Sequence, residues 1–215
     1  MRNTPNKLLL MFVVVLLLAA GVGSPASAQS ANKQIDKLID RAGDMVSAMR
    51  AARLQIGTTV DDYNTIIDGK AEENRAAYKQ LQKSLKKSEK SAAAVGEQAE
   101  KMDLAASEYF ASWEASLSEF TSDEMRARSE ERMKETRQRY DGILQAGREA
   151  GDAFRPFVTL LKDQIVFLGH DLNPAAIEDL QDEAEKLNSQ AEEVFSKVDE
   201  TYRSALRYRA SLKPD

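Results

Sequence analysis

His170 is the only histidine in this chain of 215 residues, and the chain contains no cysteine. An adjacent histidine and carboxylate such as His170 and Asp171 can act as a general base and its orienting group when a cleft positions both. Here Asn173-Pro174 follows directly, a pattern typical of a helix start. We therefore interpret His170 as a turn residue at a helix end, where a cation also suits the helix dipole.

The other patterns that could support chemistry are missing from the sequence. The absence of cysteine excludes a thiol nucleophile and a thiolate metal site. One histidine cannot supply the two Glu-x-x-His motifs of a di-iron helical bundle. There is no Gly-rich phosphate loop and no Gly-x-Ser-x-Gly motif. We expect a protein that is not an enzyme, with no catalytic, cofactor-binding or metal-binding residues and no cofactor.

The N-terminus has the pattern of a secretory signal peptide. Arg2 and Lys7 precede an unbroken apolar run over 8–20, and Ala26-Ser27-Ala28 is a small-x-small cleavage site. The run is shorter than the roughly 20 residues that span a bilayer. We predict a signal peptide over 1–28, cleavage after Ala28, a single domain over 29–215, and a periplasmic or secreted location.

Composition favours long helices in the predicted mature chain. Of its 187 residues, 88 are Ala, Glu, Lys, Leu or Arg, and no proline occurs from residue 29 to residue 155. Removing the two basic residues of the leader from the total of 30 leaves 28 against 35 acidic residues, a net charge of −7. An exported acidic chain is a poor candidate for nucleic-acid binding.

Apolar residues recur in alternating steps of three and four residues, as a coiled-coil seam requires. We predict an all-α fold, an elongated antiparallel four-helix coiled-coil bundle, with helices near 32–67, 70–120, 122–168 and 174–211. Asp68-Gly69 should end the first helix, Thr121 with Glu124 should form a capping box, and Gly169 should close the third helix. Pro156 should kink that helix. Small seam residues should allow close helix approach, namely alanines 92, 99, 106, 184, 191 and 205.

Charge is unevenly distributed along the predicted helices. Lys79–Lys101 contains six Lys and three Glu, whereas Glu178–Glu200 contains nine acids and two Lys. We interpret these as two solvated faces that attract each other across the bundle and fix its register. An anionic membrane surface or cell-wall polymer on the lysine face, and a partner on the acidic face, are the alternatives.

Aromatic and arginine residues gather around the connection between the second and third predicted helices. Tyr109, Trp113 and Phe120 fall on the seam and should pack in the core, and Phe110 could pack on a third helix. Arg132 occupies a seam position in an arginine-rich stretch over 126–139. That stretch is either a partner site or a frayed tip of the bundle.

Three segments resemble the bacterial domain-of-unknown-function family numbered 2959: SWEASLSEF over 112–120, SEERMKETRQRYDGIL over 129–144, and FRPFVTLLKDQIVFLGHDLNPAAIEDL over 154–180. The third segment is the distinctive one. The resemblance implies an exported helical protein, often with coiled-coil character. It implies no activity, ligand or site residue.

We expect an exported cell-envelope protein that acts as an interaction or structural module, presenting helical faces to a protein partner or to another copy of itself. A periplasmic holdase-type chaperone is one alternative. A carrier of a small molecule or lipid, with a cavity near Phe154–Leu168, is another.

Overall fold

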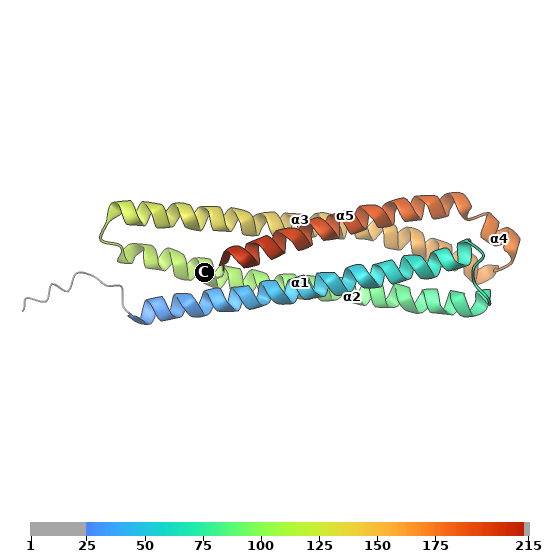
Figure 1. The fold of residues 1–215 in the computed structure, drawn as a ribbon, viewed down its shortest axis with the longest axis horizontal. Helices are drawn as coiled ribbons and strands as arrows, with labels where there is room; N and C mark the ends of the chain where they lie inside the picture. The colour runs from blue at the N-terminus through green and yellow to red at the C-terminus, as the bar shows by residue number, and fades with distance from the viewer. Residues whose placement is uncertain (1–24, 213–215) are drawn as a thin grey trace, which may run out of the picture.

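The structure is a computed structural model that describes residues 25–212, and within that range every regular element is a helix. The elements are α1 (Pro25–Ile67), α2 (Asn74–Ser116), the 3₁₀ turn η1 (Leu117–Glu119), α3 (Asp123–His170), α4 (Pro174–Glu178) and α5 (Gln181–Leu212). Four long antiparallel helices form an elongated bundle, as the heptads predict (Figure 1). At 1.5 Å per residue, the longest helix spans about 70 Å.

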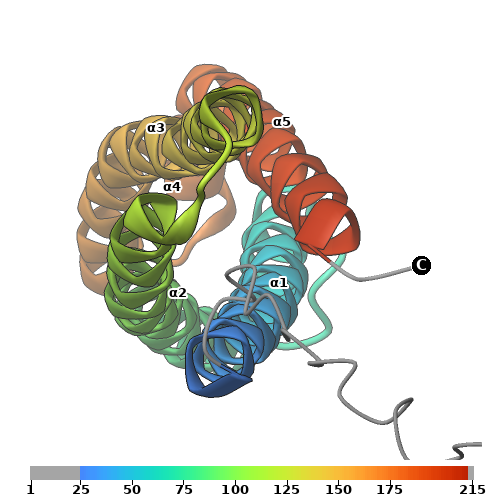
Figure 2. The same cartoon turned by 90° about the vertical axis from the view of Figure 1, so that its left-hand side faces the viewer.

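The four long helices are arranged in a ring in which each packs on two neighbours (Figure 2). α1 packs on α2 and α5, and α3 packs on α5 and α2. The α1–α2 contact is the most extensive, and the α2–α3 contact is the least extensive of the four. As a result, α2 and α5 lie diagonally across the bundle.

The core is divided into two clusters along the bundle axis. The distal cluster, at the end that carries α4, is centred on fully buried side chains such as Tyr63, Phe157 and Leu187. The proximal cluster, toward the chain termini, contains Met45, Met102 and Tyr208. Most predicted seam residues are buried in one of the two clusters, which confirms the heptad assignment.

Two predicted helix ends are confirmed by their backbone geometry. Gly69 has a φ of 66°, and its N–H and that of Lys70 donate to the carbonyls of Ile66 and Thr65, which is the Schellman pattern. Asn173 caps α4 by accepting a hydrogen bond from the Ala176 N–H at 2.9 Å, with Pro174 in the first helical position. Both connections therefore follow directly from local sequence.

Several predicted boundaries are wrong by a few residues. The second helix begins at Asn74 instead of 70, because Gly69 and Lys70 belong to the Schellman turn. The N-cap of α3 is Ser122 instead of Thr121: the Ser122 hydroxyl accepts from the Met125 N–H at 3.3 Å. The predicted last helix is split by a turn at residues 179–180, where the Leu180 N–H donates to Ile177 and both side chains enter the distal core.

Gly169 does not end α3, which continues through His170. A Cβ atom at Gly169 would lie 2.6 Å from the hydroxyl oxygen of Tyr78, which donates to the Ile165 carbonyl at 3.1 Å. The glycine thus accommodates the close approach of an α2 side chain and does not mark a helix end. α3 also continues through Pro156, which is exposed.

Most of the predicted signal peptide, residues 1–24, lies outside the described residues, and residues 25–28 form the first turn of α1. Within residues 25–212, no helix is both long enough and apolar enough to cross a membrane.

Candidate functional sites: a central cavity and two charged faces

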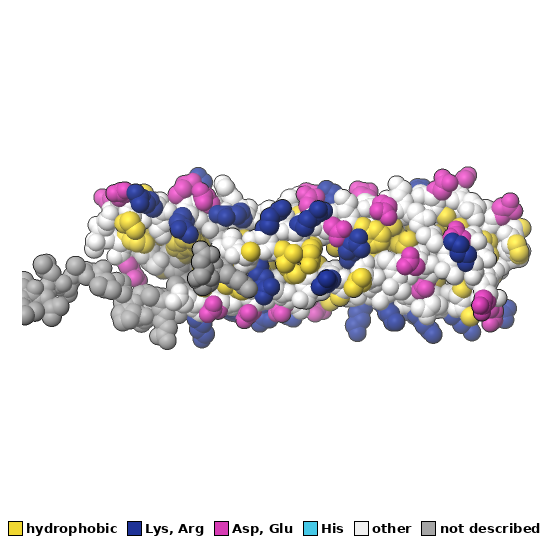
Figure 3. Space-filling model, viewed as in Figure 1, with side chains coloured by type: hydrophobic (Ala, Val, Ile, Leu, Met, Phe, Trp, Pro, Cys, Tyr) yellow, Lys and Arg dark blue, Asp and Glu magenta, His cyan; other side chains and the backbone are white. Residues whose placement is uncertain are grey.

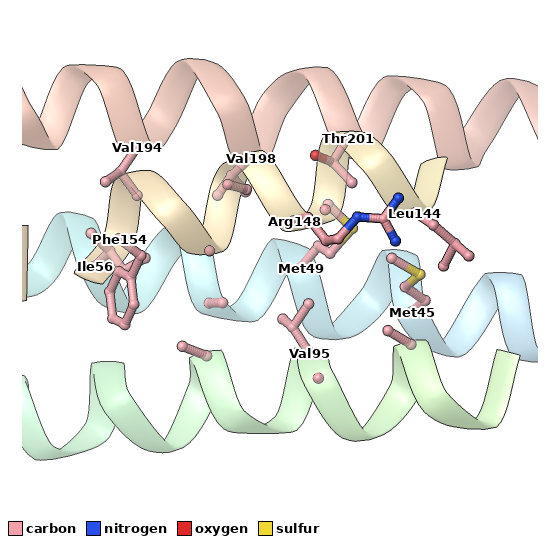
Figure 4. A pocket seen from close by; sticks show the side chains of 17 residues that line it. Met45, Met49, Ile56, Val95, Leu144, Arg148, Phe154, Val194, Val198 and Thr201 are labelled. Carbon is pink, nitrogen blue, oxygen red and sulfur yellow. The ribbon is translucent and has the colours of Figure 1, made fainter. Parts of the chain in front are cut away.

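A cavity of about 330 Å³ lies inside the bundle between the distal and proximal core clusters (Figure 4). All four long helices contribute to its wall. The lining residues are Met45, Met49, Ala52 and Ile56 of α1; Ala92, Val95, Gly96 and Ala99 of α2; Leu144, Gly147, Arg148, Ala150, Gly151 and Phe154 of α3; and Val194, Val198 and Thr201 of α5.

Small residues of α2 and α3 form much of the cavity wall and leave its space unfilled. Ala92, Gly96 and Ala99 of α2 and Gly147 and Gly151 of α3 all line it. A Cβ added at Gly96 or Gly151 would have no neighbour within 4 Å. We expected the seam alanines to bring helices together, and those at 106, 184, 191 and 205 are buried. Ala92 and Ala99 are instead half-exposed and line the cavity.

The cavity wall is apolar except at one edge. Thr201 donates its hydroxyl hydrogen to its own helix, at the Lys197 carbonyl, and turns its methyl group toward Gly147. Arg148 is the only charged lining residue, and its side chain lies beside Leu144 and Thr201 (Figure 4). Its guanidinium donates to the Gln145 side-chain oxygen at 3.0 and 3.2 Å and makes no ion pair within residues 25–212.

The first part of α2 carries an exposed lysine strip. We define the lysine strip as Lys79, Lys83, Lys86, Lys87 and Lys90, all of which are exposed. None of these five lysines forms an ion pair in the part of the chain that the structure describes. Figure 3 shows basic side chains in a row along the lower edge of the distal half of the molecule, where α2 lies. The strip therefore presents five uncompensated positive charges on an otherwise acidic protein.

The first part of α5 carries the opposite charge. We define the acidic strip as Asp182, Glu183, Glu185, Glu192 and Glu193, all exposed; only Glu183 has an ion-pair partner among the described residues, Lys186 of its own helix at 3.8 Å. We expected the lysine and acidic faces to attract each other within one bundle, and this is wrong. α2 and α5 are diagonal in the ring, so the two strips face solvent on opposite sides.

Other cross-helix ion pairs fix the ring instead. Lys37 of α1 pairs with Glu108 of α2 at 2.6 Å, and Arg53 of α1 pairs with Asp199 of α5 at 2.7 Å. Two further pairs join α3 to its neighbours: Lys162 to Glu89 of α2 at 2.6 Å, and Lys197 of α5 to Glu149 at 2.8 Å. The hydrogen bond from Lys197 lowers the pKa of Glu149 and raises that of Lys197.

Aromatic packing at the proximal end agrees with the sequence. Phe110 is buried against Tyr140 of α3, with ring centroids 6.1 Å apart, so it does pack on a third helix. Burial raises the pKa of Tyr109 to about 12. Burial and a hydrogen bond to Asp103 raise the pKa of Tyr140. Trp113 packs on the proximal cluster and donates to the Ser129 hydroxyl at 2.9 Å. Phe120 is the exception: it is half-buried after η1 and belongs to neither core cluster.

The arginine-rich stretch over 126–139 is an ordered helix with local partners. Arg126, Arg128 and Arg139 pair with carboxylates three or four residues away, and Arg137 lies 4.5 Å from the Phe110 ring centroid. Arg132 is exposed, and the neighbouring Met133 packs on the proximal core in its place. Because most of these positive charges are compensated locally, the stretch should bind an anion more weakly than the lysine strip does.

His170, the first candidate for chemistry, is the exposed last residue of α3. The Asp171 carboxylate accepts from the Asn173 backbone and side-chain amides at 3.0 and 2.8 Å, so it orders the turn. Among the described residues, no group of three or more His, Asp or Glu side chains could hold a metal ion.

The family model described as protein of unknown function (DUF2959) matches residues 27–212. The chain belongs to this family. The match confirms the resemblance seen in the three sequence segments, and it includes the cavity and both charged strips. No curated protein and no solved structure matches the chain.

We expected a possible cavity near Phe154–Leu168, and the observed one shares Phe154 with that segment but otherwise lies on its N-terminal side. Phe157 and Leu161 are fully buried in the distal core instead. The signal that could have located the cavity is the coincidence of small residues on two predicted helices, Ala92-x₃-Gly96-x₂-Ala99 and Gly147-x₂-Ala150-Gly151.

Proposed function

We propose that this protein is an exported, non-enzymatic interaction module of the cell envelope that assembles with further copies of itself. The observation that carries the proposal is the pair of exposed strips of opposite charge on opposite sides of one bundle, in which Glu183 is the single member with an ion-pair partner among the described residues. The signal-peptide pattern over 1–28 supports export, and the absence of a catalytic pattern from the sequence supports a binding role.

The strips are placed so that they can meet between copies but not within one. Lys79 to Lys90 lies in the first turns of α2, and Asp182 to Glu193 lies in the first turns of α5. Both helices begin at the distal end, so the strips are level with each other along the axis (Figure 1). Each strip covers 11 residue steps, about 17 Å of helix. Two bundles lying side by side in parallel therefore bring a lysine strip against an acidic strip.

Such an assembly is heterologous, because different surfaces of the two copies meet, and it can extend beyond a dimer. Each exposed ion pair stabilises by only about 0–1 kcal/mol, so the association depends on several pairs acting together. It should weaken as salt shortens the screening length from about 10 Å at 0.1 M to about 3 Å at 1 M.

Reciprocal charge reversal tests the proposal. One variant carries Lys83→Glu, Lys86→Glu and Lys87→Glu, and the other carries Glu185→Lys, Glu192→Lys and Glu193→Lys. The mass of the mature protein is measured by sedimentation over a range of protein and salt concentrations. We expect the unaltered protein to associate at low salt, each variant alone to stay monomeric, and an equimolar mixture of the variants to associate again.

The matched control is Lys134→Glu, which reverses an exposed lysine of α3 outside both strips and should not change the association. If the measured mass of the unaltered protein remains that of a monomer at low salt and high protein concentration, self-assembly is refuted. If the monomer then binds anionic vesicles through its lysine strip, that face is assigned to a membrane surface.

A second candidate function, a carrier of an apolar ligand, is favoured by the central cavity. Its volume of about 330 Å³ falls within the range of small-molecule sites, about 300–1,000 Å³. The mature protein, purified from its native host, should then retain a ligand that native mass spectrometry detects as added mass. Recovery of the bare chain alone would count against it.

A further inference from the structure

We propose that the central cavity binds a single alkyl chain that ends in an anionic headgroup, with the chain inside the bundle and the headgroup on Arg148. This inference rests on the carrier function and names its ligand class. Three features of the cavity lead to it: its elongated shape, its apolar wall and the position of its one charge.

The cavity is elongated along the bundle axis. Its lining extends from Met45 to Ile56 on α1 and from Leu144 to Phe154 on α3, which corresponds to about 15 Å of helix on each. A void of this length between antiparallel helices fits an extended chain better than it fits a compact ring system.

The wall of the central cavity offers water few hydrogen-bond partners. An apolar cavity of about 150 Å³ stays dry and takes up apolar ligands, and this cavity is larger. Apart from Arg148, the lining offers only aliphatic, aromatic and thioether groups and the methyl face of Thr201. The flexible side chains of Met45 and Met49 can adapt to the surface of an alkyl chain. Hydrocarbon therefore suits this wall better than a polar molecule does.

Arg148 is placed at the opening between α2 and α3. It lies two heptads before Lys162 on α3, and Lys162 reaches Glu89 of α2, so both side chains leave α3 on its α2-facing side. The cavity wall on that side consists of Ala92, Gly96 and Ala99, which are half-exposed or exposed. The guanidinium thus stands where a ligand that enters between α2 and α3 would leave its headgroup.

The charge on Arg148 is available to a ligand. The neighbouring carboxylate of Glu149 is engaged by Lys197 at 2.8 Å, and among residues 25–212 neutral Gln145 is the one side chain that holds the Arg148 guanidinium. A guanidinium binds carboxylate or phosphate through two parallel hydrogen bonds. Either a fatty carboxylate or an alkyl phosphate satisfies this chemistry.

The test is calorimetric titration of the full mature protein with dodecanoate, dodecyl phosphate and uncharged dodecyl maltoside, each below its micelle-forming concentration. Three variants are compared. Arg148→Gln removes the charge, Gly151→Leu fills the cavity from a position where an added Cβ meets nothing within 4 Å, and Arg155→Gln is the control. Arg155 lies one heptad further along α3, pairs with Asp152 and does not line the cavity.

We expect at least one of the two anions to bind, and the tighter one identifies the headgroup. Arg148→Gln should weaken anion binding about tenfold or more, consistent with loss of a charge-assisted bidentate contact. Arg148→Gln should leave the affinity for dodecyl maltoside unchanged, and Arg155→Gln should leave the affinity for every probe unchanged. Gly151→Leu should remove binding of every probe while circular dichroism shows an intact bundle.

Equal affinity of the anions for the unaltered protein and Arg148→Gln would overturn the headgroup assignment while leaving an apolar carrier intact. No binding of any of the three probes to the unaltered protein would overturn the carrier function as well. Binding that survives Gly151→Leu would place the chain outside the cavity and refute the proposal.

Discussion

Two valines of α5 provide a direct test of the central cavity. Val194 and Val198 lie one helical turn apart on the same seam, and each is replaced by alanine. Both line the cavity, but Val194 is fully buried and belongs to the distal core cluster, whereas Val198 is half-buried. The two substitutions remove the same atoms and gain the same helix propensity, about 0.5 kcal/mol. Any difference in cost therefore reports the packing around each side chain.

The expected costs follow from what surrounds each valine. Removal of two methyl groups loses about 1.6 kcal/mol of transfer free energy when the side chain is fully buried. The enlarged void beside the fully buried Val194 adds to that loss, so Val194→Ala should lower the free energy of unfolding by about 2 kcal/mol after the propensity gain. Val198 lines the same cavity but is only half-buried, so it has less buried apolar surface and fewer contacts to lose, and Val198→Ala should cost about 1 kcal/mol or less.

Urea unfolding followed by circular dichroism and by Trp113 fluorescence measures both costs. Coincident transitions from the two probes are needed before a single free energy is assigned to so long a bundle. An equal cost for the two variants, or a greater cost for Val198→Ala, would refute the reasoning, because it would mean that the helices close around Val198 in solution.

Two further predictions concern glycine packing and alkaline pH. Gly96→Ala should raise the melting temperature, because alanine stabilises a helix by about 1 kcal/mol relative to glycine and the new Cβ meets nothing within 4 Å. Gly169→Ala should lower the melting temperature, because the new Cβ would lie 2.6 Å from the Tyr78 hydroxyl oxygen. A rise for both variants in a thermal melt would contradict the Tyr78 contact. The pKa of Tyr109 is about 12 in the folded chain and about 10 when unfolded, so its contribution to stability is complete below pH 10 and is lost as the pH rises to 12. Chemical unfolding at stepped pH should show a shallower loss for Tyr109→Phe than for the unaltered protein, and equal slopes would count against this burial effect.

Local signals in the sequence were sufficient where the determinant is itself local. The left-handed turn at Gly69 and the Asn173-Pro174 cap each depend on a few adjacent residues, and both were predicted correctly. The seam residues follow from a period of about 3.5, because side chains at that spacing share one helical face. The N-cap at Ser122 was missed because Thr121 and Ser122 are both good caps and only the path of the chain selects between them.

The candidate sites depended on features that no local pattern contains. Ala92 and Ala99 have the same residue type and seam spacing as the buried Ala184 and Ala191, yet they line a cavity. The same cavity wall includes Gly147 and Gly151 of α3, which have no side chains to fill the space. Gly169 was likewise misinterpreted, because the side chain that closely approaches it comes from Tyr78, 91 positions earlier in the chain.

The sequence alone determined that this chain forms four long antiparallel helices with buried heptad seams, because periodicity, caps and short connections act within each helix or between consecutive ones. The order of the helices around the ring depends on tertiary packing. A seam specifies which face turns inward but not which helix it meets, so different ring orders bury the same residues. The observed order makes α2 and α5 diagonal and α2 and α3 neighbours, which separates the lysine and acidic strips and brings the small residues together around the cavity.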